Sequence, residues 1–77
     1  MDNIEGKYFL HFKGGKYRIL HVGKDSETQE AVIIYQALYG NHDIWVSPKV
    51  MFYENVERSD YSGPRFSEIS GKEALDT

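Results

Sequence analysis

Residues 7–22 read KYFLHFKGGKYRILHV, two runs rich in aromatic and aliphatic residues on either side of Gly14 and Gly15. A two-residue hairpin turn of type I′ needs positive φ at both central positions, and glycine adopts it without strain. The stretch therefore predicts a β-hairpin with the glycine pair as its turn. The residue pairs expected across this hairpin are Phe12 with Tyr17, Leu10 with Ile19, and Tyr8 with His21.

This pairing divides the hairpin into an apolar face and a largely basic face. The apolar face would cover the core, as in a half-buried antiparallel sheet. The residues expected on the other face are Lys7, Phe9, His11, Lys13, Lys16, Arg18 and Leu20. Most of them are cationic or can become so, and this face is therefore predicted to be basic.

The rest of the chain predicts further short strands. Residues 24–30 are polar and predict a loop, whereas the consecutive β-branched residues of 31–39 predict a central strand. Ser47 and Pro48 resemble an N-cap and a first-turn proline. The remaining elements expected are a turn at 40–43, a strand at 44–46, a helical turn at 49–53, a loop at 56–63, a last strand at 65–69 and a frayed tail at 70–77.

These elements predict an all-β fold in a single domain spanning residues 1–77, with its core at about 6–69. A chain of 77 residues is too short to bury two independent cores. Five short strands, with one short helical turn before the last, are typical of a small SH3-like barrel, closed or half-open.

Composition narrows the classes of function. The absence of cysteine removes a disulfide framework and favours a cytoplasmic location. No apolar run approaches the ~20 residues that cross a bilayer, so no membrane partner is expected. The net charge of −3 is unevenly distributed. Residues 1–24 are basic on balance and residues 25–77 acidic, which argues against indiscriminate binding to phosphate backbones.

One set of residues, spread over the whole predicted core, resembles a known family. These residues are Gly6-Lys7-Tyr8, His11-Phe12-Lys13-Gly14, Tyr17, Ser26-Glu27-Thr28, Tyr35, Leu38-Tyr39, Trp45-Val46, Pro48, Met51-Phe52 and Pro64-Arg65-Phe66. Their order and spacing resemble domain of unknown function 1653, a family of small, mainly bacterial proteins. The resemblance implies no activity. The chain departs from the family at Asp25, where a histidine is usual, and at Ser47, where an arginine is usual. A ligand bound by those two side chains would be lost or altered here.

No catalytic or metal-binding constellation emerges, so the chain is predicted not to be an enzyme and to need no cofactor. His11, His21 and His42 lack ligand spacing, and no serine lies in a nucleophile-elbow context. Most aromatic residues of so small a domain are expected in the core.

The candidate binding residues are aromatic and basic. Tyr35 and Trp45 are amphipathic rings on neighbouring predicted strands, and Arg65 can hold an anion or pair with an acidic residue. The predicted binding surface therefore comprises Tyr35, Trp45 and Arg65, edged by His11, Lys13, Lys16 and Arg18.

Two functions remain open. The first is a non-enzymatic binding module that recognises a protein or peptide through this aromatic and basic surface. The second is binding of RNA or single-stranded DNA through the same surface. The sequence predicts neither the partner nor the oligomeric state.

Overall fold

The structure, a computed structural model, describes residues 3–75 and is mainly β, as the sequence predicts. In chain order, its elements are β1 (Tyr8–His11), β2 (Lys16–Lys24), β3 (Ala31–Ala37), β4 (Ile44–Pro48), α1 (Lys49–Phe52), β5 (Asn55–Arg58), β6 (Tyr61–Pro64), β7 (Phe66–Ile69) and α2 (Gly71–Leu75).

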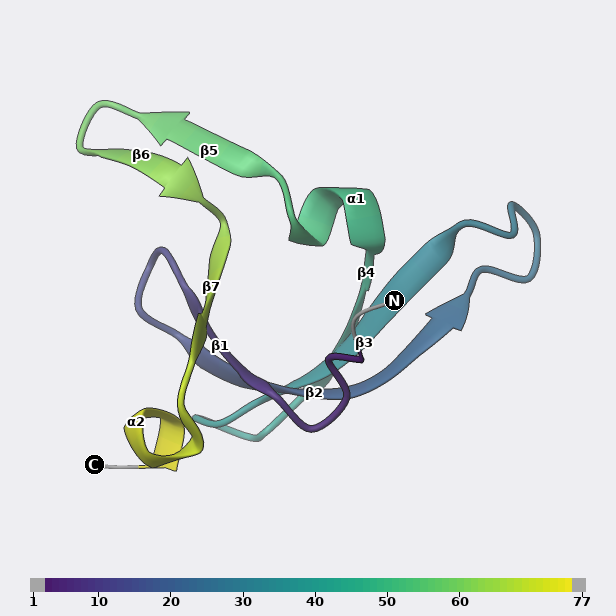
Figure 1. The fold of residues 1–77 in the computed structure, drawn as a ribbon, viewed down its shortest axis with the longest axis horizontal. Coiled ribbons are helices and arrows are strands. Elements are labelled where there is room, and N and C mark those ends of the chain that lie inside the picture. The colour runs from purple at the N-terminus through teal and green to yellow at the C-terminus, as the bar shows by residue number, and fades with distance from the viewer. Residues whose placement is uncertain (1–2, 76–77) are drawn as a thin grey trace.

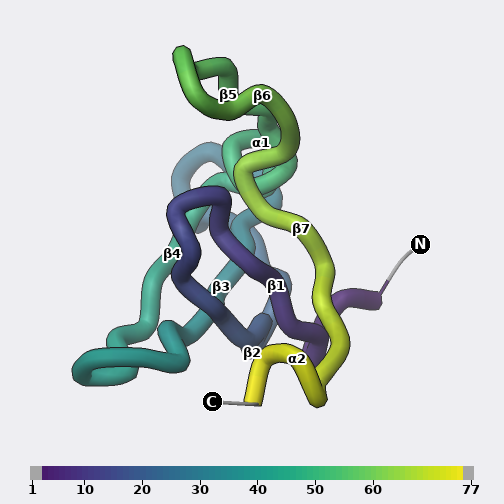
Figure 2. The backbone as a smooth tube through the Cα atoms, turned by 90° about the vertical axis from the view of Figure 1, so that its left-hand side faces the viewer, coloured from purple at the N-terminus to yellow at the C-terminus, as the bar shows by residue number. Residues whose placement is uncertain are grey.

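The strands form a five-stranded antiparallel sheet and a separate hairpin. The order in the sheet is β4-β3-β2-β1-β7, and β5 pairs with β6. The sheet curves strongly, and the β5–β6 hairpin projects beyond it (Figure 1). The two edge strands, β4 and β7, lie on opposite sides of the molecule (Figure 2). They do not pair within residues 3–75, so the sheet is open there and the SH3-like barrel stays a prediction.

The β1–β2 hairpin is present, but its predicted pairing is wrong. Phe9 lies opposite Tyr17, and Leu10 opposite Lys16. The turn contains three residues, 12–14, because the His11 N–H donates to the Gly15 carbonyl at 2.7 Å. Of the two glycines only Gly14 has a positive φ, of 106°. A three-residue loop with its glycine in third position is the other common hairpin connection.

This register exchanges the two faces of β1, because it differs from the predicted pairing by three residues, an odd number. Directly opposed residues share a face of a sheet. We call the face that carries Phe9, Tyr17 and Ile19 the inner face, and the reverse side the outer face. His11 continues the inner face, whereas Lys16 and Arg18 lie on the outer face with Tyr8 and Leu10. The predicted basic face is therefore divided between the two sides of the sheet.

The core lies against the inner face. Its buried members are Ile4, Phe9, Ile19, Ile33, Phe52 and Phe66. Phe52 is the buried residue of α1 and stacks on Phe66 of β7, with ring centroids 4.2 Å apart. Ile4 precedes the predicted start of the core at residue 6, so the core begins earlier than the sequence indicates.

Two further segments differ from the sequence prediction. Residues 56–63, predicted as a loop, contribute to the β5–β6 hairpin, in which Val56 is buried. Residues 71–75 of the predicted frayed tail form α2, and Ala74 is buried. Residues 76–77 of that tail lie outside the described residues. The tail is therefore structured at least as far as Leu75.

Both helices are short. The helical turn predicted at 49–53 is α1, but Pro48 occupies its N-cap position and Ser47 makes no capping bond, so the predicted serine cap is wrong. Within the described part of the chain, neither helix has the length or the apolar character needed to cross a membrane.

Candidate functional site

Three tyrosines meet on the inner face. Tyr17 belongs to β2, Tyr35 to β3, and Tyr39 follows β3 by two residues. The Tyr17 ring contacts Tyr35 and Tyr39 edge to face, with centroid distances of 5.2 and 5.6 Å. The hydroxyls of Tyr17 and Tyr39 are hydrogen-bonded to each other. We call these three residues, together with His11 and Arg65, the tyrosine site.

Gly15 permits this packing. A Cβ added at Gly15 would lie 3.0 Å from Tyr39 Cε1 and 3.1 Å from Tyr17 Cε1. Gly14 is in open space and is needed for its positive φ instead. The glycine pair therefore serves two purposes, turning the chain and making room for two phenol rings.

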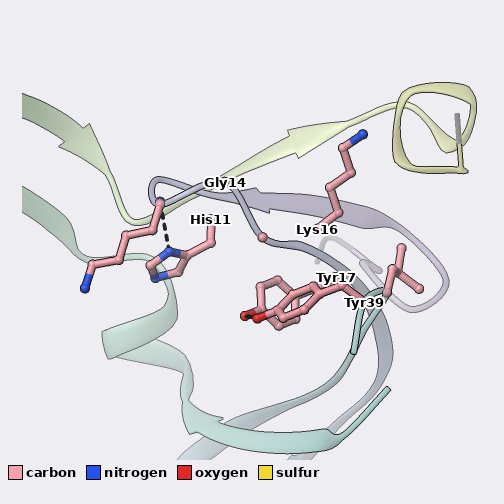
Figure 3. A pocket seen from close by; sticks show the side chains of 8 residues that line it. His11, Gly14, Lys16, Tyr17 and Tyr39 are labelled. Atoms are coloured by element: carbon pink, nitrogen blue, oxygen red, sulfur yellow. Dashed lines mark hydrogen bonds between the residues drawn. The ribbon is translucent and has the colours of Figure 1, made fainter. Parts of the chain in front are cut away.

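A surface hollow of about 510 Å³ opens beside the tyrosine pair. Its lining residues are His11, Lys13, Gly14, Gly15, Lys16, Tyr17, Leu38 and Tyr39, none of them acidic. The Tyr17 and Tyr39 hydroxyls lie on the side of the hollow where His11 is found (Figure 3). The Lys16 side chain extends away from them toward α2, where its Nζ donates to the Glu73 carbonyl at 2.9 Å.

His11 is partly buried at this site and lies near positive charges. Its ring packs against Phe66 at 4.9 Å, and its Nδ1 accepts the Lys13 backbone N–H at 3.1 Å. The neutral ring therefore carries its proton on Nε2 and can donate a hydrogen bond there. Partial burial lowers the pKa of His11, and the charges of Arg65, Lys13 and Arg58 lower it further.

The hydroxyls of Tyr17 and Tyr35 keep their protons at neutral pH. Burial raises the pKa of Tyr17, and the hydrogen bond with Tyr39 adds to this effect. Burial and Tyr39 also raise the pKa of Tyr35, against a smaller opposing effect of Arg65. The hydroxyls of Tyr17 and Tyr35 are therefore hydrogen-bond donors and acceptors rather than bases.

Arg65 joins the site to its surroundings. Its Nη2 lies 2.9 Å from Glu54 Oε1, and its carbonyl accepts the Phe12 N–H at 3.0 Å. Its Nε is buried and has no hydrogen-bond partner within residues 3–75. The side chain is 29% exposed and so keeps some access to solvent beside its ion pair.

Trp45 extends the site toward the sheet edge. It lies directly opposite Tyr35 across β3 and β4, so both belong to the inner face, and it is 52% exposed. Of the residues predicted from the sequence, the structure places Tyr35, Trp45 and His11 on this face, Arg65 immediately before β7, and Lys13 in the β1–β2 turn. Lys16 and Arg18 lie on the outer face, where the Arg18 guanidinium is 5.9 Å from the Tyr8 ring centroid.

Sequence reasoning missed Tyr17 and Tyr39, which it assigned to the core by default. Tyr39 is 50% exposed, and its position next to the predicted turn at 40–43 was the available signal. The two departures from the family pattern lie elsewhere. Asp25 binds the backbone N–H groups of its own loop, and Ser47 lies on β4 two residues after Trp45. Residues 3–75 contain no group of three acidic or histidine side chains suited to a metal ion.

The comparisons with known proteins agree with each other. A family model described as a protein of unknown function, DUF1653, matches residues 7–68. The crystal structure of a DUF1653 protein from Bordetella bronchiseptica is similar to this one, with a TM-score of 0.75 and 25% sequence identity. The similarity covers 84% of this chain and 86% of that one. No curated protein matches the sequence. Since the family model spans most of the chain and the fold agrees, this chain belongs to the DUF1653 family.

Proposed function

We propose that the chain is a non-enzymatic module that binds an acidic peptide segment of another protein at the tyrosine site. The observation that carries this proposal is the hollow beside Tyr17 and Tyr39, which has no acidic lining residue in a chain of net charge −3. A carboxylate entering it meets the hydroxyl pair of Tyr17 and Tyr39 and the ring of His11. The exposed rings of Trp45 and Tyr39 offer contact area for the neighbouring residues of the peptide.

The protonation states favour binding over catalysis. The raised pKa values of Tyr17 and Tyr35 keep these hydroxyls protonated near neutral pH, so neither supplies a phenolate that could act as a base. Burial is the largest cause of the lowered pKa of His11, and the nearby positive charges of Arg65, Lys13 and Arg58, which lower it further, also attract anions. One tyrosine of the hydrogen-bonded pair donates to the other, and the hydroxyl proton of the second remains for a ligand.

The same rings support the second candidate, single-stranded RNA or DNA, through base stacking. The acidic balance of residues 25–77 disfavours it, because a nucleic-acid backbone extends well beyond one hollow and meets that charge.

Fluorescence anisotropy with two labelled peptides tests the proposal. One peptide alternates glutamate with glycine, and the other has glutamine in place of glutamate. We expect the glutamate peptide alone to bind, and Tyr39→Phe to weaken it about fivefold by removing one hydroxyl. Lys13→Ala is expected mainly to slow association and flatten its salt dependence, because a charge at the margin steers the encounter.

The matched control is Lys24→Ala, which removes the same charge at the far end of β2. Once a natural partner is known, Arg65→Ala should act mostly through faster dissociation, provided that the variant remains folded. Equal binding of the two peptides, or equal effects of Lys13→Ala and Lys24→Ala, would reject the acidic-peptide site.

Two finer expectations belong with this proposal. The strong curvature of the sheet in Figure 1 and the helical turn after β4 favour a half-open barrel of the SH3-like kind. A cytoplasmic location agrees with a sequence that contains no cysteine.

A further inference from the structure

The edge strand β4 has an unusual composition. It pairs with β3 and stands at the end of the sheet. Ile44 and Val46 are 60% and 63% exposed, and no residue of the strand is charged. Soluble proteins commonly protect such edges with charged side chains. The opposite edge strand, β7, follows this rule, since it carries Glu68, which pairs with Lys7 at 3.6 Å.

The register shows which backbone groups of β4 face outward. The Ala37 N–H donates to the Asp43 carbonyl at 2.9 Å, and the pairing continues in the same register along the strand. Bonded and non-bonded pairs alternate in an antiparallel ladder, so Trp45 and Ser47 also bond to β3. The N–H and C=O groups of Ile44 and Val46 therefore point away from the sheet.

Pro48 agrees with this assignment. It has the same parity as Ile44 and Val46, so its missing N–H lies on the outward side and the ladder with β3 loses no bond. Its carbonyl belongs to the N-cap of α1 and accepts the first bond of that helix, so it does not belong to the free edge. The free edge of β4 thus offers the N–H and C=O groups of Ile44 and Val46.

The two charges that flank β4 have opposite signs, so they can pair with those of a second, antiparallel β4 strand. Asp43 precedes the strand and Lys49 follows it, at equal distances from Val46. In an antiparallel pair of two β4 strands centred on Val46, Asp43 comes to the same end as Lys49 of the partner subunit, where α1 begins, and the same opposite charges meet at the other end. Val46 then lies opposite Val46 of the partner subunit, and each donates its backbone N–H to the carbonyl of the other.

We propose that the chain forms a two-fold dimer through antiparallel pairing of β4 with β4 of a second copy, centred on Val46. The outer-face side chains of Ile44 and Val46 join those of the partner in one apolar strip, which extends to Ile34 of β3 because Ile34 lies opposite Val46. Two-fold symmetry requires such a self-complementary surface. This interface goes beyond the peptide site and uses none of Tyr17, Tyr35, Tyr39, His11 and Arg65, although Trp45, which borders that site, belongs to the same strand.

Analytical ultracentrifugation provides the first test. An interface of this small size is expected to have a dissociation constant on the order of 10–100 μM. Trp45 is the single tryptophan of the chain, so its emission should shift to shorter wavelength over the same concentration range as water leaves the interface. Val46→Lys places two lysines opposite each other and should weaken the dimer at least tenfold.

The matched control is Leu75→Lys, since Leu75 is also 63% exposed but lies in α2. Thermal unfolding checks that both variants remain folded. A protein that is monomeric up to several hundred micromolar would overturn the proposal, and so would a dimer that Val46→Lys leaves intact. Peptide binding by the Val46→Lys variant reports separately on the tyrosine site, so failure of one proposal is distinguishable from failure of the other.

A disulfide test checks the register. The chain contains no cysteine, so a single introduced cysteine gives an unambiguous cross-link. Residues opposed as a bonded antiparallel pair have Cα atoms about 5.5 Å apart, which a disulfide spans. Val46→Cys should therefore cross-link under mild oxidation much faster than Leu75→Cys. Faster cross-linking by Trp45→Cys than by Val46→Cys would overturn the Val46-centred pairing.

Discussion

Gly14 is required for its positive φ, so its substitution should cost more stability than substitution of an ordinary strand glycine. Gly14→Ala forces a side chain into positive φ, with an expected loss of about 1–2 kcal/mol in the free energy of unfolding. Gly23→Ala in β2 is the control, because its φ is not positive and the nearest atoms to a new Cβ are 3.9 Å away. Urea denaturation measures both. Equal losses would contradict the role of the Gly14 backbone.

His11 gives a second prediction at the same scale. Its pKa in the folded state lies below 6.5, so the unfolded chain binds the proton more tightly. The stability that His11 contributes is therefore present above pH 6.5 and is lost as the pH falls through the folded-state pKa. Proton NMR of the ring should show this lowered pKa, and Lys13→Ala should raise it. Lys24→Ala, with the same loss of charge, should have a smaller effect, and a folded-state pKa above 6.5 would refute the positive potential.

At the scale of the element, helix α1 packs against the core through one buried side chain, that of Phe52. Phe52 is fully buried against Phe66 and Phe9, whereas Val50 is 75% exposed. Phe52→Ala should cost about 3–5 kcal/mol, close to the whole stability of a small domain, so Phe52→Leu is the more practical variant. Val50→Ala in the same helix should change stability by less than about 0.5 kcal/mol. Chemical denaturation measures the free energy of unfolding of the three variants. Similar losses in all three would contradict the packing of α1 described above.

Elements with a clear hydrophobic pattern could be predicted from the sequence, and those without one could not. The strand at 31–39 was predicted because β-branched residues crowd it, and β3 occupies most of that range. Residues 8–12 are apolar or aromatic at almost every position, so a pattern of alternating apolar and polar residues does not distinguish the two possible registers. The predicted assignment of the two β1 faces was therefore wrong. The β5–β6 hairpin was missed because Val56 is its one buried residue among polar neighbours.

At the scale of the whole molecule, the sequence suggested part of the site. Side-chain chemistry alone identifies four candidates, Tyr35, Trp45, Arg65 and His11. It does not predict which of these residues are neighbours in the folded protein. The contact between Tyr17 and Tyr39 joins residues 22 positions apart and depends on the β2–β3 register and on the space left by Gly15. Such a contact becomes visible only when the sheet is assembled.

The charge distribution of the molecule predicts weak binding to nucleic acid. Acidic residues dominate after position 24, and Lys16 and Arg18 are turned away from the tyrosine site. We expect no gel shift of a single-stranded RNA or DNA oligonucleotide by micromolar protein at physiological ionic strength, and at most weak association at low salt. A shift that persists at physiological salt, and that Trp45→Ala abolishes in a folded protein, would favour the nucleic-acid function.

The unequal edges of the sheet limit how far an assembly of this protein can grow. In polymer chemistry, a monomer with one reactive end stops at the dimer, and one with two reactive ends forms a chain. In the proposed dimer β4 is the reactive end, whereas β7 carries a charged side chain, Glu68, of the kind that disfavours pairing at an edge. Pairing through β4 consumes the reactive end of both copies. If the proposed dimer forms, the same exposed apolar edge that invites association therefore limits it to two copies, and we expect no fibres by light scattering at high concentration.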